Sequence, residues 1–141
     1  MSTAVVIYRS RSGTTRRYGE EIGAHLRSRG LETRVVSIGE CDLERLREAD
    51  LVLLGCWTNG LMVVLQHPDQ PWLDFARDLP PIPGARVGLF TTYKLATGSM
   101  FSRMRAALAG KAGPIGLELK SRSGGLSDGD RRALDRFIET P

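Results

Sequence analysis

Short apolar runs rich in β-branched residues alternate with amphipathic segments five times along this chain of 141 residues. The run Leu51-Val52-Leu53-Leu54 is apolar at every position, as expected of a strand that is covered on both faces. The alternation predicts an α/β fold, in which helices pack on both faces of a parallel sheet. The length suits one domain spanning residues 1–141. The expected strands are residues 3–9, 31–38, 50–56, 86–92 and 114–119.

The segments between the expected strands carry helical signals. Tyr18, Ile22 and Leu26 recur every fourth residue ahead of Gly30, and Pro71 suits the first position of a helix. The expected helices are residues 14–29, 43–49, 71–79, 99–109 and 128–139. Because crossovers between parallel strands are right-handed, we expect a three-layer sandwich with the strand order 2-1-3-4-5. Ligands bind such sheets beyond the carboxyl ends of the strands, at the switch point between strands 1 and 3.

Composition narrows the class of protein. Twenty Lys and Arg residues against sixteen Asp and Glu residues give a net charge of +4, which permits an anionic ligand or partner. The chain has no long basic run interleaved with aromatic residues, so we do not expect nucleic-acid binding. No apolar run approaches the ~18–20 residues of a membrane span. With no basic leader and only two cysteines, the chain is expected to be cytoplasmic, with both thiols reduced.

The loop after the first expected strand is the clearest candidate site. Residues 10–15 read Ser-Arg-Ser-Gly-Thr-Thr and join a strand to the start of a helix, where hydroxyls and free backbone amides can surround a phosphate. The loop lacks the lysine and spacing of a nucleoside-triphosphate loop, and it lacks the G-x-G-x-x-G dinucleotide motif. The alternative is helix capping alone, with Ser12 or Thr14 at the N-cap.

The pattern formed by Ser10, Ser12, Gly13 and Thr15 resembles the flavodoxin phosphate loop, [TS]-x-[TS]-G-x-T. The resemblance extends along the whole chain, and the uninterrupted fifth strand is similar to that of short-chain flavodoxins. It implies a flavodoxin-like fold, non-covalently bound flavin mononucleotide (FMN) and one-electron transfer between redox partner proteins. The residues it implies around FMN are Ser10, Arg11, Ser12, Gly13, Thr14, Thr15, Trp57, Thr58, Asn59, Gly60, Thr92, Tyr93 and Gly98.

Within that set, the resemblance places the Asn59–Gly60 peptide beside the isoalloxazine ring, where its carbonyl turns to accept a hydrogen bond from flavin N5 on reduction. The alternative is an ordinary Asn-Gly turn. Trp57 either stacks on the ring or is a tryptophan of the core or the pocket rim. Lys94 stands in a loop where flavodoxins usually carry acidic residues, which predicts a less negative redox potential and redox partners with acidic docking surfaces.

The segment of residues 61–65, Leu-Met-Val-Val-Leu, has no obvious place in the sheet. It is expected either as a helical turn in the core or as an apolar docking surface or dimer contact.

Residues 125–129 match the G-x-S-x-G motif of hydrolases, but no histidine follows His67, so Ser127 is expected to cap the last helix with Asp130. His25 and His67 do not stand at metal-ligand spacing with either cysteine.

Two functional alternatives to an electron carrier stay open. The first is an enzyme, because residues 8–16 also resemble the start of the flavodoxin-like, quinone-linked protoporphyrinogen oxidases. The second is a flavodoxin fold that binds a partner and no flavin. Whether the protein turns over a substrate is therefore left undecided by the sequence.

Overall fold

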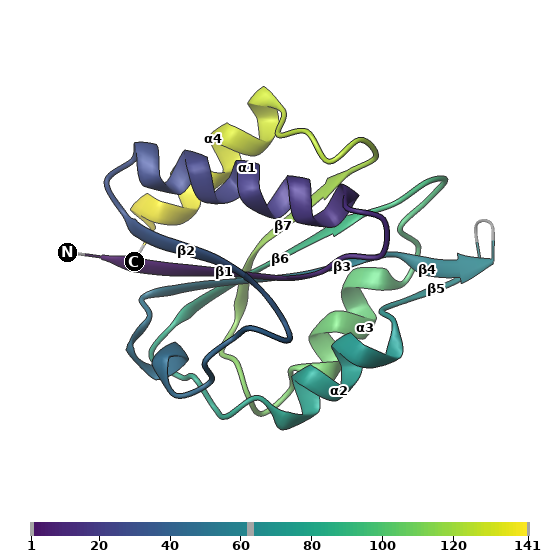
Figure 1. The fold of residues 1–141 in the computed structure, drawn as a ribbon, viewed down its shortest axis with the longest axis horizontal. Coiled ribbons are helices and arrows are strands. Elements are labelled where there is room, and N and C mark those ends of the chain that lie inside the picture. Colours follow the sequence, from purple (N-terminus) through teal and green to yellow (C-terminus); the bar gives the residue numbers. More distant parts are fainter. Residues whose placement is uncertain (1, 62–63, 141) are drawn as a thin grey trace.

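The central element of the structure, a computed structural model that describes residues 2–61 and 64–140, is a five-stranded parallel sheet (Figure 1). The strand order is β2-β1-β3-β6-β7, which in chain order of these five strands is 2-1-3-4-5. The predicted fold class and strand order are therefore confirmed. The bounds are β1 Thr3–Arg9, β2 Glu32–Ser37, β3 Leu51–Trp57, β6 Arg86–Thr92 and β7 Ile115–Ser121.

Helices cover both faces of this sheet. In Figure 1, α1 (Thr14–Ser28) and α4 (Asp128–Glu139) lie on one face, and α2 (Gln70–Asp78) and α3 (Met100–Ala107) lie on the other. The expected helix at residues 43–49 is a short 3-10 helix, η1 (Arg45–Glu48).

Two helix starts test the predicted capping. Ser127 caps α4 and forms the predicted capping box with Asp130. Helix α2 begins at Gln70 rather than at Pro71, because the Asp69 side chain one residue earlier accepts the Trp72 N–H and acts as the N-cap.

Two apolar clusters fill the space between the sheet and its helices. In β1, Val5 and Ile7 belong to the cluster beneath α2 and α3, whereas Ala4 and Val6 belong to the cluster beneath α1 and α4. All four residues of the run 51–54 are buried and are divided between the two clusters. The continuous apolar run therefore marks a strand covered on both faces, as predicted.

A small antiparallel hairpin follows β3 and projects from the end of the sheet (Figure 1). It consists of β4 (Asn59–Leu61) and β5 (Val64–His67), with Asn59 opposite His67. The prediction of a helical turn at residues 61–65 is wrong, because the backbone on both sides is extended and paired across the hairpin. The Asn-Gly turn is also wrong, because both residues lie within β4. The docking or dimer contact depends on Met62 and Val63, which lie outside the described residues, and stays a prediction.

The close contact between Gly55 and Phe90 shows how tightly the middle of the sheet is packed. The two residues are register partners in β3 and β6, and a Cβ on Gly55 would come within 2.1 Å of the Phe90 ring. That ring meets Tyr18 of α1 edge to face, with centroids 5.9 Å apart. Gly55 therefore lets the Phe90 ring lie across the strand beneath α1.

We predict that Gly55→Ala lowers the free energy of unfolding by ~1–3 kcal/mol, because the added methyl overpacks the Phe90 ring. Urea denaturation followed by far-UV circular dichroism measures the change. Gly39→Ala is the matched control, since nothing lies within 4 Å of a Cβ at that position. Equal midpoints for the two variants would contradict this account of the packing.

Candidate functional site

A pocket of about 470 Å³ opens where the carboxyl ends of β1, β3 and β6 meet their loops. This is the edge at which parallel α/β sheets bind ligands, and the volume is typical of a small-molecule site. Its lining comes from the three loops that the sequence singled out, together with the hairpin and the end of β7. The lining residues are Arg11, Ser12, Thr14, Thr15, Trp57, Thr58, Asn59, Gln66, Thr92, Tyr93, Lys94, Leu95, Ala96 and Arg122.

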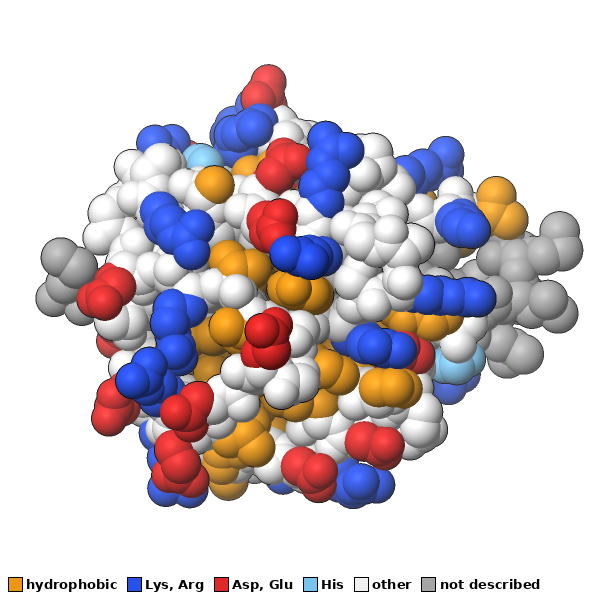
Figure 2. Space-filling model, viewed as in Figure 1, with side chains coloured by type: hydrophobic (Ala, Val, Ile, Leu, Met, Phe, Trp, Pro, Cys, Tyr) orange, Lys and Arg blue, Asp and Glu red, His pale blue; other side chains and the backbone are white. Residues whose placement is uncertain are grey.

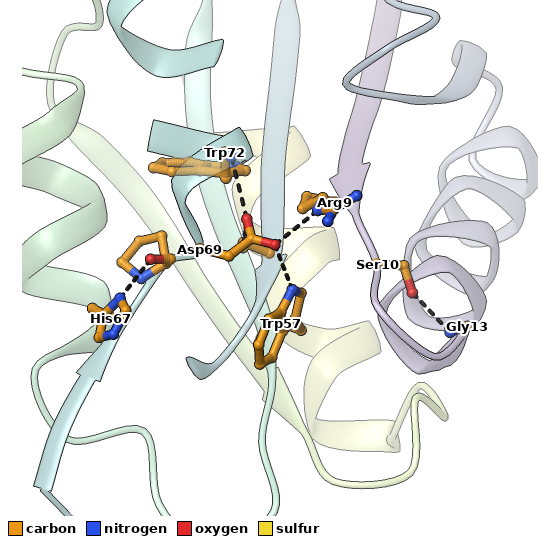
Figure 3. Close-up of polar contacts among 9 residues, drawn as sticks. Arg9, Ser10, Gly13, Trp57, His67, Asp69 and Trp72 are labelled. Atoms are coloured by element: carbon orange, nitrogen blue, oxygen red, sulfur yellow. Dashed lines mark hydrogen bonds and ion pairs between the residues drawn. The ribbon is translucent and has the colours of Figure 1, made fainter. Parts of the chain in front are cut away.

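The loop before α1 lies at the pocket, and it leaves the start of that helix without a side-chain cap. Gly13 is the N-cap residue with φ of 96°, a left-handed conformation that glycine adopts readily, and its N–H donates to Ser10 Oγ at 3.0 Å (Figure 3). No side chain caps α1, so the alternative of Ser12 or Thr14 as N-cap is wrong. The N–H groups of the first helical turn have no intrahelical partner. Together with the pocket-lining hydroxyls of Ser12 and Thr14, they suit an anion.

Buried threonine hydroxyls tie the loops of the pocket together. Thr15 is 1% exposed, and its Oγ1 lies 2.6 Å from Oγ1 of Thr92 at the end of β6. Thr58 Oγ1 lies 2.8 Å from Thr91 Oγ1, and the Thr58 N–H donates to the Thr92 carbonyl at 2.8 Å. The hydroxyl of Thr15 therefore joins the start of α1 to the end of β6, and Thr15 is also among the residues that line the pocket.

Trp57 and Tyr93 are the aromatic residues of the lining, and a cationic side chain lies over the ring of each. The Arg11 guanidinium lies 5.1 Å from the Trp57 ring centroid, and the Arg122 guanidinium lies 5.4 Å from that of Tyr93. Lys120 Nζ is also 5.9 Å from the Tyr93 ring. Such contacts hold aromatic and cationic side chains against each other at the pocket mouth.

The pocket is basic. Arg11, Lys94 and Arg122 line it, and no Asp or Glu does so among the described residues. In Figure 2, Lys and Arg side chains are spread over the face shown, whereas most of its Asp and Glu side chains lie away from the end from which the hairpin projects. Leu95, whose side chain is large and apolar, is 56% exposed and lines the same pocket.

Asp69 is a residue near the site that the sequence analysis missed. Its buried carboxylate accepts hydrogen bonds from Arg9 Nε at 2.8 Å and from Trp57 Nε1 at 2.7 Å (Figure 3). It also accepts the Trp72 N–H at 3.2 Å and lies 3.7 Å from the Cys56 sulfur. Burial raises the pKa of the Cys56 thiol, which is thus kept neutral. An Asp two residues ahead of Pro71 is an N-cap signal that could have located Asp69.

Most residues predicted for the site meet in the pocket. Thirteen were predicted, and those that line it are Arg11, Ser12, Thr14, Thr15, Trp57, Thr58, Asn59, Thr92 and Tyr93. Ser10 and Gly13 shape the loop behind the lining. Gly60 lies in β4 beside Asn59, and Gly98 lies two residues before α3. Five further lining residues were not among the thirteen, because their positions depend on the hairpin and on the folding of the loops: Gln66, Lys94, Leu95, Ala96 and Arg122.

The family model described as flavodoxin matches residues 6–132. The chain belongs to the flavodoxin family. A curated relative, the flavodoxin of Megasphaera elsdenii, is 29% identical over 94 residues, which is 66% of this chain and 66% of that protein.

Solved structures agree with the fold. The solution structure of two-electron reduced M. elsdenii flavodoxin has a TM-score of 0.76 at 18% identity, covering 97% of this chain and 99% of that one. Oxidised flavodoxin 1 from Bacillus cereus has a TM-score of 0.73 at 23% identity, covering 98% of this chain and 96% of that one.

Flavodoxins bind FMN and transfer electrons, so family membership supports both for this chain. The residues present fit FMN, because a loop rich in hydroxyls and amides adjoins a pocket with two aromatic side chains. Neither the enzyme alternative nor the flavin-free alternative is favoured by the comparisons. Within the described residues, no helix is long and apolar enough to cross a membrane, and no cluster of three His, Cys, Asp or Glu residues could hold a metal ion.

We predict that the double variant Ser12→Ala with Thr14→Ala binds FMN at least ~100-fold more weakly, because two hydrogen bonds to a phosphate dianion are worth ~1.5–3 kcal/mol each. Riboflavin, which lacks the phosphate, should bind nearly as before. Fluorescence titration of both ligands gives the ratio. Ser102→Ala in α3 is the control, since its hydroxyl donates to the Ser99 carbonyl outside the pocket lining. A parallel loss for FMN and riboflavin would contradict the phosphate assignment.

Proposed function

We propose that this flavodoxin carries single electrons between redox partner proteins, with FMN held non-covalently in the pocket at the carboxyl ends of β1, β3 and β6. The observation that carries the proposal is the uncapped start of α1 next to the aromatic side chains of Trp57 and Tyr93. FMN supplies the redox chemistry when bound. The protein binds its phosphate, borders its ring, excludes water from one side and sets the surrounding charge.

In this proposal the predicted residues fall into two groups. The phosphate is held by the loop formed by Ser10, Arg11, Ser12, Gly13, Thr14 and Thr15. The ring is bordered by Trp57, Thr58, Asn59, Gly60, Thr92, Tyr93 and Gly98. The position of Asn59 in the lining supports a role for the Asn59–Gly60 peptide beside the ring, and its pairing with His67 would link any movement of that peptide to the hairpin.

The positive charge around the pocket supports the proposal that the redox partners have acidic docking surfaces. Arg11, Lys94 and Arg122 would steer an acidic protein surface towards the pocket mouth, and exposed Leu95 would give that partner an apolar contact. We also place the protein in the cytoplasm, which the absence of a disulfide between Cys41 and Cys56 supports.

Adding FMN to the purified protein tests the proposal directly. We expect a perturbed flavin absorption spectrum and quenched flavin fluorescence, with riboflavin binding more weakly. Potentiometric titration of the complex should then show reversible reduction of the bound flavin. A protein that binds neither ligand would be a partner-binding flavodoxin fold rather than an electron carrier.

We predict that Lys94→Glu lowers the midpoint potential for forming the reduced, anionic flavin. A unit charge ~8 Å away at an effective dielectric of ~20 contributes ~2 kcal/mol, or ~90 mV, before screening by salt. Because Lys94→Glu changes the charge by two units, the expected shift before screening is ~180 mV. Potentiometry at low and high ionic strength measures the shift. Arg47→Glu makes the same charge change in η1, at the amino-terminal side of β3, and should shift the potential far less. Equal potentials for wild type and Lys94→Glu at low salt would refute this electrostatic account.

The charge of small electron acceptors should control the rate at which the reduced protein is reoxidised. Anionic ferricyanide should react faster at low salt than at high salt, and a cationic cobalt(III) complex should show the opposite dependence. Stopped-flow absorbance gives both rates. The same salt dependence for the two probes would argue against a basic docking surface.

A further inference from the structure

The two oxygens of the buried Asp69 carboxylate have different partners (Figure 3). Oδ1 accepts the Trp72 N–H and caps α2, and the Cys56 sulfur lies 3.7 Å from it. Oδ2 accepts both Arg9 Nε and Trp57 Nε1, at 2.8 and 2.7 Å. Capping requires a single oxygen, which a serine could supply. The second oxygen, with its charge, is therefore left to hold Arg9 and Trp57.

The contacts of Oδ2 join the pocket wall to two strand ends. Arg9 ends β1, and its register partner Cys56 stands next to Trp57 at the end of β3. The Arg9 side chain is 37% exposed and that of Asp69 8% exposed, so Arg9 provides the charge that a buried carboxylate needs. Trp57, held by its indole N–H, lines the pocket. A net neutral ion pair therefore lies directly behind one wall of the pocket.

We propose that Asp69 is a positioning residue that fixes the Trp57 indole as a wall for the flavin, and that the Asp69–Arg9 pair sets the local charge acting on the flavin potential. This inference rests on the proposed function. The indole can rotate out of the wall only by breaking a bond to an ionised acceptor, which is among the stronger hydrogen bonds in proteins. The positive and negative members of the pair act on an added electron with opposite signs.

Two variants separate the roles of Asp69. Asp69→Asn keeps an oxygen for the α2 cap, but it sets an NH2 group against the N–H donors of Arg9 and Trp57. Arg9→Gln removes the cation and leaves the Trp57 bond in place. Ser127→Ala is the control, because it removes an N-cap of the same kind from α4, and Ser127 is not among the pocket-lining residues.

The first readout uses the protein without flavin. The chain has two tryptophans, so its ¹H–¹⁵N spectrum has two indole signals, which Trp57→Phe assigns. In Asp69→Asn the Trp57 signal should shift upfield and its proton should exchange faster with water, while the Trp72 signal stays in place. In Arg9→Gln and Ser127→Ala the Trp57 signal should remain near its wild-type position. An unchanged Trp57 signal in Asp69→Asn would overturn the positioning role.

The second readout uses the flavin complex. Asp69→Asn should weaken FMN and riboflavin alike, by about tenfold, because the wall serves the ring rather than the phosphate. Its midpoint potential should rise, since a negative charge is lost, whereas that of Arg9→Gln should fall. Potentials that move in the same direction would overturn the charge role. Failure of the wild-type protein to bind FMN would instead overturn the proposed function, while the indole signals would still decide whether Asp69 positions Trp57.

Discussion

Burial of the sheet on both faces is the constraint on which the rest of the structure depends. With α1 and α4 on one side and α2 and α3 on the other, the strands carry apolar residues on both faces. Polar side chains that can bind a ligand are therefore found at the ends of the strands, where loops leave the sheet. Three of these loops meet at the switch point, and the threonine pair Thr15–Thr92 ties two of them together across the pocket. The position of the site therefore follows from the helices that cover both faces of the sheet.

Charge is distributed unevenly about that site. The pocket lining carries Arg11, Lys94 and Arg122, whereas the negative charge nearest to its Trp57 wall, Asp69, is buried and paired with Arg9. Cations at the mouth act on solutes that approach through solvent and are screened by salt. The Asp69–Arg9 pair acts over a short range because its opposite charges cancel at longer distances, and its carboxylate is shielded from solvent. The cations of the lining and the Asp69–Arg9 pair are therefore two separate sets of charges near the site.

Features encoded locally were predictable from the sequence, and features that depend on distant contacts were not. The run of residues 51–54, the period of α1 and the Ser127 capping box each depend on neighbours in the chain, and all were confirmed. The loop of residues 10–15 could be placed at the pocket from the sequence because its pattern is contiguous. The hairpin was missed, since an apolar run does not distinguish extended pairing from a buried turn. Asp69 was missed because its partners Arg9 and Trp57 lie 60 and 12 residues away.

The β4–β5 hairpin stands outside the five-stranded sheet, with its two strands paired to each other. It supplies Asn59 and Gln66 to the pocket, and the Gln66 carbonyl accepts a hydrogen bond from Ser99 Oγ at 2.9 Å. Because β4 and β5 pair only with each other, a change in their pairing would alter the lining of the pocket and leave the ladder of the five-stranded sheet as it is.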